Sequence, residues 1–390
     1  MKSITDLHLL LSKNLPDVER LVDKRFSHFF LYFHFLKFSC ILVMTYENPD
    51  PQSTTDRPVP FNPRIVINPL LLLATFFTTT VAGVGWVGRD YFALDNFAYG
   101  LEYSLAILFV LGSHEFGHYF AARFHGVKTT LPFFIPFPPL PFFLNFGTLG
   151  AVIRTRSVVP SRKAMFDIGV AGPIAGFVAC LIVLAYGFYT LPGSEYILSI
   201  HPHFDFNLNT DPTSQGIPLE FGSTLLYSTL QGLLTNPDVQ FVPPMSEMYH
   251  FPFLCVGWFG LFVTAMNLIP IGQFDGGHIL YTMLGEKHRA IAKFSFITLL
   301  ILGLPSVLDS LIRMFMVYFD NASQSSVIPL AEYSWGGWFL WALISYFVVK
   351  LYHPPVPDET PLDEKRMLVG WFSVVIFVVC FSFAPFTIPL

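Results

Sequence analysis

The residues best suited to chemistry lie together in one apolar stretch, His114-Glu115-Phe116-Gly117-His118. The stretch predicts a helix, and residues i and i+4 of a helix share one face, about one turn apart. Both imidazoles can therefore reach one cation, and Zn²⁺ binds His nitrogens in a four-coordinate site. Glu115 lies about 100° around the helix from His114, where it reaches a water on the metal more easily than the metal itself. This is the general-base position of H-E-x-x-H hydrolases.

A further ligand is needed, because a catalytic zinc has three protein ligands and one open position. Asp275 is the best candidate, since it directly follows the uncharged run 251–274. Pro270 breaks or kinks the helix ahead of it, and Asn267 offers a side-chain hydrogen bond nearby. Without a metal, the motif would be two packed histidines beside an unpaired acid, which is costly in lipid. The residues therefore favour a metal site in which Asp275 joins the two histidines.

The composition indicates that these residues lie in a membrane. Apolar residues make up 53% of the 390 residues and charged residues 13%, against about 25% charged in soluble domains. Phe alone occupies 44 positions, and the mean hydropathy is +0.54. So few charges exclude a soluble enzyme of this size, and so many aromatics exclude a disordered chain. The net charge of -5 gives no basic footprint for nucleic acid.

The predicted fold class is an all-α polytopic membrane protein with about six to seven transmembrane helices, since a bilayer core needs about 20 apolar residues per helix. The candidate spans are Ile65–Val87, Tyr103–Ala122, Ile168–Thr190, Phe251–Phe274, Phe294–Leu308 extended toward Arg313, Tyr333–Val349 and Met367–Leu390. The run Phe26–Met44 contains His and Lys, which are costly at mid-bilayer, so an interfacial position is predicted for it. Met44 is an alternative start, because a polar, Pro-rich leader follows it.

The distribution of Lys and Arg between the spans predicts the orientation. Loop 124–166 contains Lys and Arg but no acid, whereas loop 191–250 contains acids but no Lys or Arg. Loop 124–166 and the N-terminus are therefore predicted to be cytoplasmic, and loop 191–250 to face outside. The second and fourth spans then both run from outside to inside. This topology puts the two histidines and Asp275 at a similar depth, toward the cytoplasmic side.

The segment Leu131–Ile153 is apolar, but its prolines forbid a continuous helix. Non-helical backbone at membrane depth is tolerated only against protein or a water-filled cavity. A re-entrant loop or short hairpin beside the metal site is therefore predicted, with a strand edge that can pair with an unwound substrate segment. The alternative is an interfacial linker rich in proline and aromatic residues.

Two motifs together, HEFGH in the second span and NLIPIGQFDG after it, resemble the site-2 protease family of intramembrane zinc metalloproteases. The family pattern, HExxH followed by NxxPxxxxDG, is matched at each fixed position. The resemblance implies that His114, His118 and Asp275 are the zinc ligands. It implies that Glu115 is the catalytic base and acid. It also implies that Asn267 orients the substrate or stabilises the oxyanion.

The resemblance covers about residues 100–290, with the second, third and fourth spans as a three-helix catalytic core. In the third span, Ala171–Gly176 is similar to the Gly-rich core helix of the family. Its small-xxx-small spacing by itself indicates close helix packing. The stretch Phe146–Ala151 is similar to the membrane-inserted β element of the family.

The predicted function is the hydrolysis of peptide bonds in transmembrane protein substrates, within or beside the lipid bilayer, with Zn²⁺ as cofactor. The family implies a helix-destabilised substrate, often already trimmed outside. Three alternatives stay open. A divalent-metal transporter would place acids in several spans. A membrane protease of the prenyl-protein-processing type would use a glutamate as third ligand. A non-catalytic scaffold is disfavoured by the intact Glu115. The sequence leaves the oligomeric state open.

These predictions divide the chain into a cytoplasmic or interfacial leader 1–64, spans one to three at 65–190, an extracytoplasmic loop 191–250, spans four and five at 251–317 and C-terminal spans at 335–390. No PDZ domain is expected in the outer loop, and no nucleotide-binding domain after Pro385. A bacterial inner membrane is expected, because no eukaryotic targeting signal is recognised. The four cysteines are expected to be buried apolar residues. No metal role is assigned to the remaining histidines considered, His125, His201, His203 and His278.

Overall fold

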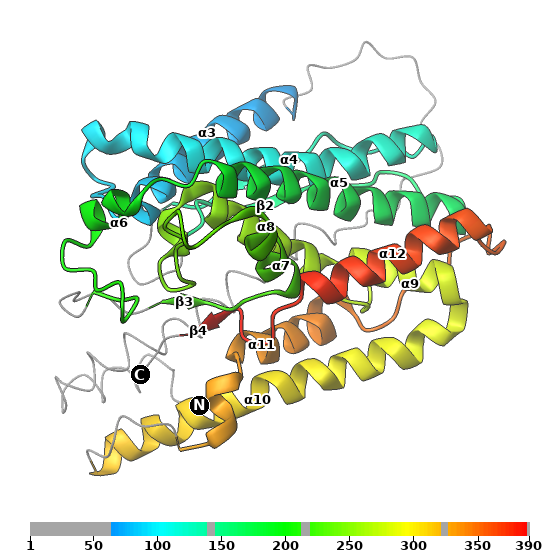
Figure 1. Cartoon of the computed structure of the whole chain (residues 1–390). Helices are drawn as coiled ribbons and strands as arrows, with labels where there is room; N and C mark the ends of the chain where they lie inside the picture. Colours follow the sequence, from blue (N-terminus) through cyan, green and yellow to red (C-terminus); the bar gives the residue numbers. More distant parts are fainter. Residues whose placement is uncertain (1–63, 139–144, 212–218, 321–326, 388–390) are drawn as a thin grey trace, which may run out of the picture.

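The computed structural model describes residues 64–138, 145–211, 219–320 and 327–387, and this part of the chain is mostly helical (Figure 1). The α-helices are α3 Arg64–Trp86, α4 Leu101–Phe124, α5 Arg162–Tyr189, α6 Ser194–Ile200, α7 Leu225–Leu234, α8 Pro252–Asn267, α9 Asp275–Leu284, α10 His288–Asp320, α11 Gly336–Ile344 and α12 Glu364–Cys380. Shorter helical turns are η1 Leu94–Gly100, η2 Met248–His250, η3 Gly285–Lys287, η4 Pro329–Tyr333 and the π-helical η5 Ser345–Val349. The predicted leader, with Phe26–Met44, lies outside the described residues up to position 63.

The helices α3, α4 and α5 run side by side along one edge of the molecule, and the long α10 runs along the opposite edge (Figure 1). The closest packing joins α4 to α5 and α5 to α8, the helices predicted as the catalytic core. Large apolar side chains fill the interior, and Tyr103, Phe188 and Trp258 are fully buried there. The metal-binding motif of the sequence therefore lies on one of the most closely packed helices of the fold.

Four helical segments in the described part of the chain are long and apolar enough to cross a membrane. They are Val66–Trp86, Leu94–Phe124, Arg162–Tyr189 and Asp275–Met316. The first three correspond to the first three predicted spans, and the last contains the fifth. The other three predicted spans are helical over shorter lengths, so the predicted number of seven is not reached by this criterion.

The predicted fourth span Phe251–Phe274 is helical only as far as Asn267, where α8 ends, and the break predicted at Pro270 is present. Pro270 interrupts the helix, and Gly272 has a φ of +56°, which favours glycine. The predicted seventh span Met367–Leu390 also ends early, at Cys380. Its continuation bends at residues 383–385 and then pairs as β4 Phe386–Thr387 with β3 Glu220–Phe221. A helix continued through Pro385 would lose a backbone hydrogen bond and bring the proline ring against the carbonyl of Phe381, four positions earlier, which disfavours helix in this segment.

A β-hairpin is present in the segment where the prolines forbid a helix. Strand β1 Phe133–Pro136 pairs antiparallel with β2 Thr148–Val152, and the register shifts before Pro136. The hairpin packs against α3, because the Thr78 hydroxyl donates to the Gly147 carbonyl at 2.6 Å. Residues 139–144 lie outside the description. The predicted hairpin is therefore found, and its entry into the membrane stays a prediction.

Candidate metal centre

The first half of the candidate site is carried by α4, an apolar helix with one polar face at its centre. His114, Glu115 and His118 are all buried, at 7%, 9% and 8% exposure. The helical spacing brings the two imidazoles together, with 3.1 Å between His114 Nε2 and His118 Nε2. Both ring nitrogens thus face the same point, as the i, i+4 spacing predicts.

The second half of the site is Asp275. The sequence predicts this residue at the end of the fourth span, whereas in the structure it is the first residue of α9. The chain turns sharply between α8 and α9, so α9 begins close beneath the end of α8. A Cβ atom at Gly276 would lie 2.0 Å from the Leu268 carbonyl oxygen, and one at Gly277 would lie 2.3 Å from the Gly272 carbonyl oxygen. Only glycine fits this approach, and the turn points the carboxylate toward α4.

The three side chains predicted as ligands lie within bonding distance of one common point. Asp275 Oδ2 is 3.4 Å from His114 Nε2 and 3.4 Å from His118 Nε2. Ligands at about 2.0–2.1 Å from a tetrahedral metal are ~3.3–3.4 Å apart, close to the three separations found. Two imidazoles and a carboxylate are also donors that zinc prefers. The residues therefore fit a zinc ion in both geometry and chemistry.

Helix α5 holds His118 in place. The His118 Nδ1–H donates to the Ile168 carbonyl at 2.7 Å, and this bond leaves the lone pair of Nε2 free for a metal. A Cβ atom at Gly172 would lie 2.1 Å from His118 Nε2, so the imidazole occupies the space that this glycine leaves. The small residues of 171–176 were predicted only to allow close helix packing. Their sequence spacing gave no sign of the contact with His118.

Two further residues lie beside the ligands. The Asn267 amide nitrogen, at the end of α8, is 3.3 Å from His114 Nε2. Glu115 lies close enough to His118 and Asp275 to interact with both electrostatically, and the Ile153 backbone just after β2 is within hydrogen-bond reach of its carboxylate. The site thus combines three candidate ligands, one acid that can move protons and one amide donor.

The remaining histidines considered in the sequence lie apart from this centre or have other partners. His125 Nε2 is 2.8 Å from Asp167 Oδ2, and Arg366 binds both carboxylate oxygens of Asp167 from α12. His278 Nδ1 is 2.7 Å from His353 Nε2. These contacts tie α12 to α5 and to the residue that follows α4, and they tie the segment before α12 to α9.

Comparison of the sequence with known proteins identifies a family. A family model described as Peptidase family M50 matches residues 102–304. Probable zinc metalloprotease EGY1, chloroplastic, of Oryza sativa subsp. japonica is 31% identical over 280 residues, 70% of this chain and 43% of that protein. Probable zinc metalloprotease EGY2, chloroplastic, of Arabidopsis thaliana is 26% identical over 264 residues, 67% of this chain and 43% of that protein. The chain thus spans less than half the length of these relatives. No solved structure matches it significantly.

Proposed function

The chain belongs to peptidase family M50, and from that premise we propose that it is an intramembrane zinc metalloprotease. His114, His118 and Asp275 hold the zinc. The observation that carries the proposal is the convergence of three donor atoms, 3.1–3.4 Å apart, from two separate helices. An acid and an amide stand beside them, as peptide hydrolysis requires.

The chain's own residues divide the chemistry between them. A bound Zn²⁺ activates water and polarises a carbonyl. Glu115 accepts a proton from the attacking water and passes it to the leaving amine nitrogen. Asn267 donates a hydrogen bond to the substrate carbonyl oxygen, where negative charge develops. No covalent intermediate with the protein is needed.

The hairpin offers a docking place for the substrate backbone. In the described part of the chain β2 pairs only with β1, and a Cβ atom at Gly150 in β2 would meet nothing within 4 Å. An unwound substrate segment can therefore add to β2 as a further strand. Glu115 lies close to the end of β2, at Ile153, so this pairing presents a peptide bond to the metal centre. The substrate class is a transmembrane protein whose helix opens readily.

The site lies in a membrane protein, to judge from the four apolar segments that are long enough to span one. The basic loop 124–166 puts the metal centre toward the cytoplasmic side under the positive-inside rule. The relatives compared above are named as chloroplastic and give no support to a bacterial inner membrane. The proposal is therefore an integral membrane protease, and it names no particular membrane of the cell.

A cleavage assay on a model transmembrane peptide in detergent tests this function. Glu115→Gln is expected to slow cleavage by about 10²–10⁴-fold, the usual contribution of a general base, and to retain zinc. A chelator is expected to abolish cleavage by the wild type. Glu102→Gln is the matched control, because Glu102 is exposed in the first turn of the same helix. Cleavage at the wild-type rate by Glu115→Gln would remove the proposed base.

A further inference from the structure

A second group of metal-binding side chains lies past the far end of α5. His201 directly follows α6. Glu247 directly precedes η2, and His250 is the last residue of η2, just before α8. Helix α5 passes the first centre at Gly172 and ends at Tyr189, and a rise of about 1.5 Å per residue separates these points by ~25 Å. The second group is therefore a separate site on the side predicted to face outside.

The donor atoms of this group converge as closely as those of the first centre. His201 Nε2 is 3.1 Å from His250 Nε2. Glu247 Oε2 is 3.3 Å from His201 Nε2 and 3.7 Å from His250 Nε2. These separations bracket the ~3.3 Å expected between ligands of a tetrahedral zinc ion. Two imidazoles and one carboxylate again make up the donor set.

The hydrogen bonds around the group direct lone pairs toward its centre. The His250 Nδ1–H donates to the Trp86 carbonyl at 2.6 Å, so the lone pair of a neutral His250 is on Nε2. Asp211 Oδ2 lies 3.8 Å from His201 Nδ1, which is longer than a hydrogen bond and does not fix the tautomer of His201. The lone pair of His250 Nε2 and a carboxylate oxygen of Glu247 both face His201 Nε2, so a cation that replaces the proton on His201 Nε2 would be held by all three atoms.

The carboxylate of Glu247 is poorly satisfied without such a cation. Its side chain is 8% exposed and that of His250 is 7% exposed. Glu247 Oε2 is buried and has no hydrogen-bond partner among the described residues, although leaving a buried acceptor unpaired is unfavourable.

We propose that His201, Glu247 and His250 form a second divalent-metal site of zinc type, distinct from the centre that carries the chemistry. Its three protein ligands leave the fourth position to water, and its place in the chain gives the ion a cross-linking role. One ligand comes from the end of α6 and two come from the turn before α8, and His250 is also bonded to the end of α3. A single ion there joins the predicted outer loop to the ends of two helices of the bundle.

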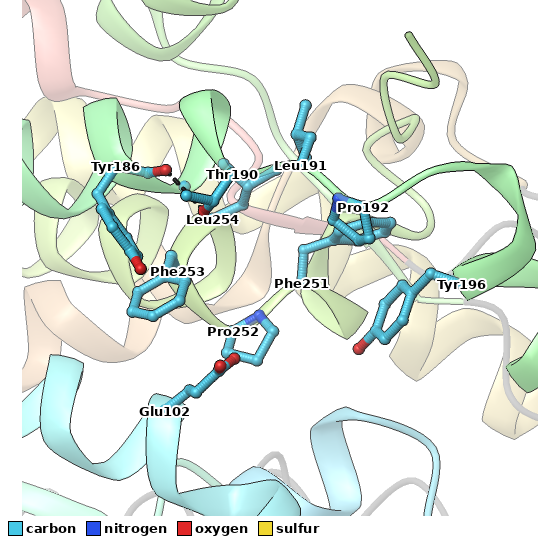
Figure 2. Close-up of a pocket in the computed structure, with 11 residues that line it drawn as sticks. Glu102, Tyr186, Thr190, Leu191, Pro192, Tyr196, Phe251, Pro252, Phe253 and Leu254 are labelled. Atoms are coloured by element: carbon cyan, nitrogen blue, oxygen red, sulfur yellow. Dashed lines mark hydrogen bonds between the residues drawn. The ribbon is translucent and has the colours of Figure 1, made fainter.

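The site borders a pocket of ≈ 270 Å³ at the same ends of the helices. Figure 2 shows Glu102 reaching toward this pocket from α4 and Tyr196 from α6, with Pro252 of α8 between them. The Tyr196 hydroxyl donates to the His250 carbonyl at 2.6 Å. This hydrogen bond joins the part of the pocket wall formed by α6 to a ligand of the metal site.

The proposal is tested by the metal content of the full chain, purified in detergent after expression with zinc. Inductively coupled plasma mass spectrometry is expected to find two zinc ions per wild-type chain, one in His201→Ala, one in His118→Ala and none in the double variant. His203→Ala is the matched control, because His203 is an exposed neighbour of His201, and it should keep both ions. A zinc content unaltered by His201→Ala would overturn the second site.

Cobalt spectroscopy covers the case in which His201→Ala folds poorly. In His118→Ala, added Co²⁺ is expected to give the visible absorption of a tetrahedral site, and Glu247→Gln in that background is expected to weaken it. No such absorption in well-folded His118→Ala overturns the proposal. The result is independent of protease activity. If the first centre bound no zinc, the wild-type chain would still contain one zinc ion, and His201→Ala would remove it.

Discussion

Two clusters in this protein have the same donor set, and only one has the surroundings of a catalyst. In each, two Nε2 atoms are 3.1 Å apart, and in each a histidine donates from Nδ1 to a backbone carbonyl. The first cluster has Glu115 and Asn267 beside it. In the second, the additional acid Asp211 lies on the Nδ1 side of His201, away from the point where the donors meet. The same ligands can therefore serve catalysis or structure, and the neighbouring acid decides which.

The two clusters also differ in what positions them. The first depends on regular helices, because α4 presents both histidines and α5 packs against one of them at Gly172. The second depends on chain ends and turns, because its ligands come from the end of α6 and from η2. A change in helix packing should therefore disturb the first cluster alone. A change in the outer turns should disturb the second.

Asp275→Asn gives the largest expected effect and tests whether the two centres are independent. The amide is a much weaker zinc ligand than the carboxylate, so the first centre should lose its ion while the second keeps its own. Zinc content is expected to fall from two ions to one per chain, and peptide cleavage to the level of the chelator-treated wild type. Asp238→Asn, at an exposed position, should change neither. Full zinc content in Asp275→Asn would remove this residue as a ligand.

The difference between the two clusters also explains what could be predicted from the sequence. His114 and His118 are four positions apart, so helical geometry alone brings them together. Asp275 was expected at the correct place, although it begins α9 instead of ending a span. The break at Pro270 is predicted from the sequence, whereas the start of a new helix at Asp275 is not, because the apolar run 251–274 gives no sign of where helix resumes.

The second cluster could not be predicted in this way. His201 and His250 are separated by 49 positions and lie in irregular segments, where no periodicity relates them. The only local signal is Glu247 three positions before His250, which is too common a spacing to indicate a metal. Gly172 shows the same limit within the first centre. A stripe of small residues predicts that two helices approach, but the side chain that fills the space depends on their register.

Gly172→Ala is expected to have an intermediate effect, confined to the first centre. The added Cβ atom would lie 2.1 Å from His118 Nε2, so the imidazole must move away from its present position. Disturbing the support of a metal ligand typically lowers metal affinity by about 10–100-fold. Competition with a chromogenic chelator measures this for each ion separately. The second ion should keep its affinity.

The matched control for this substitution is Gly232→Ala in α7, where a Cβ atom would meet nothing within 4 Å. It should leave the affinity of both ions unchanged, and the better helix propensity of alanine should stabilise the fold by about 0.5–1 kcal/mol. Equal losses of zinc affinity in the two variants would show that the contact between α4 and α5 is not what holds His118.

Tyr196→Phe gives the smallest expected effect and probes the second cluster through the support of its backbone. The substitution removes one hydrogen bond to the His250 carbonyl, a contribution of about 0.5–1.5 kcal/mol. That energy corresponds to a loss of roughly 2–10-fold in affinity for the second ion, with cleavage and the first ion unaltered. Tyr189→Phe, at a side chain that is 89% exposed, is the control. If Tyr196→Phe weakened the first ion instead, the two centres would be coupled through α5 and α8, and the division into a catalytic and a structural site would fail.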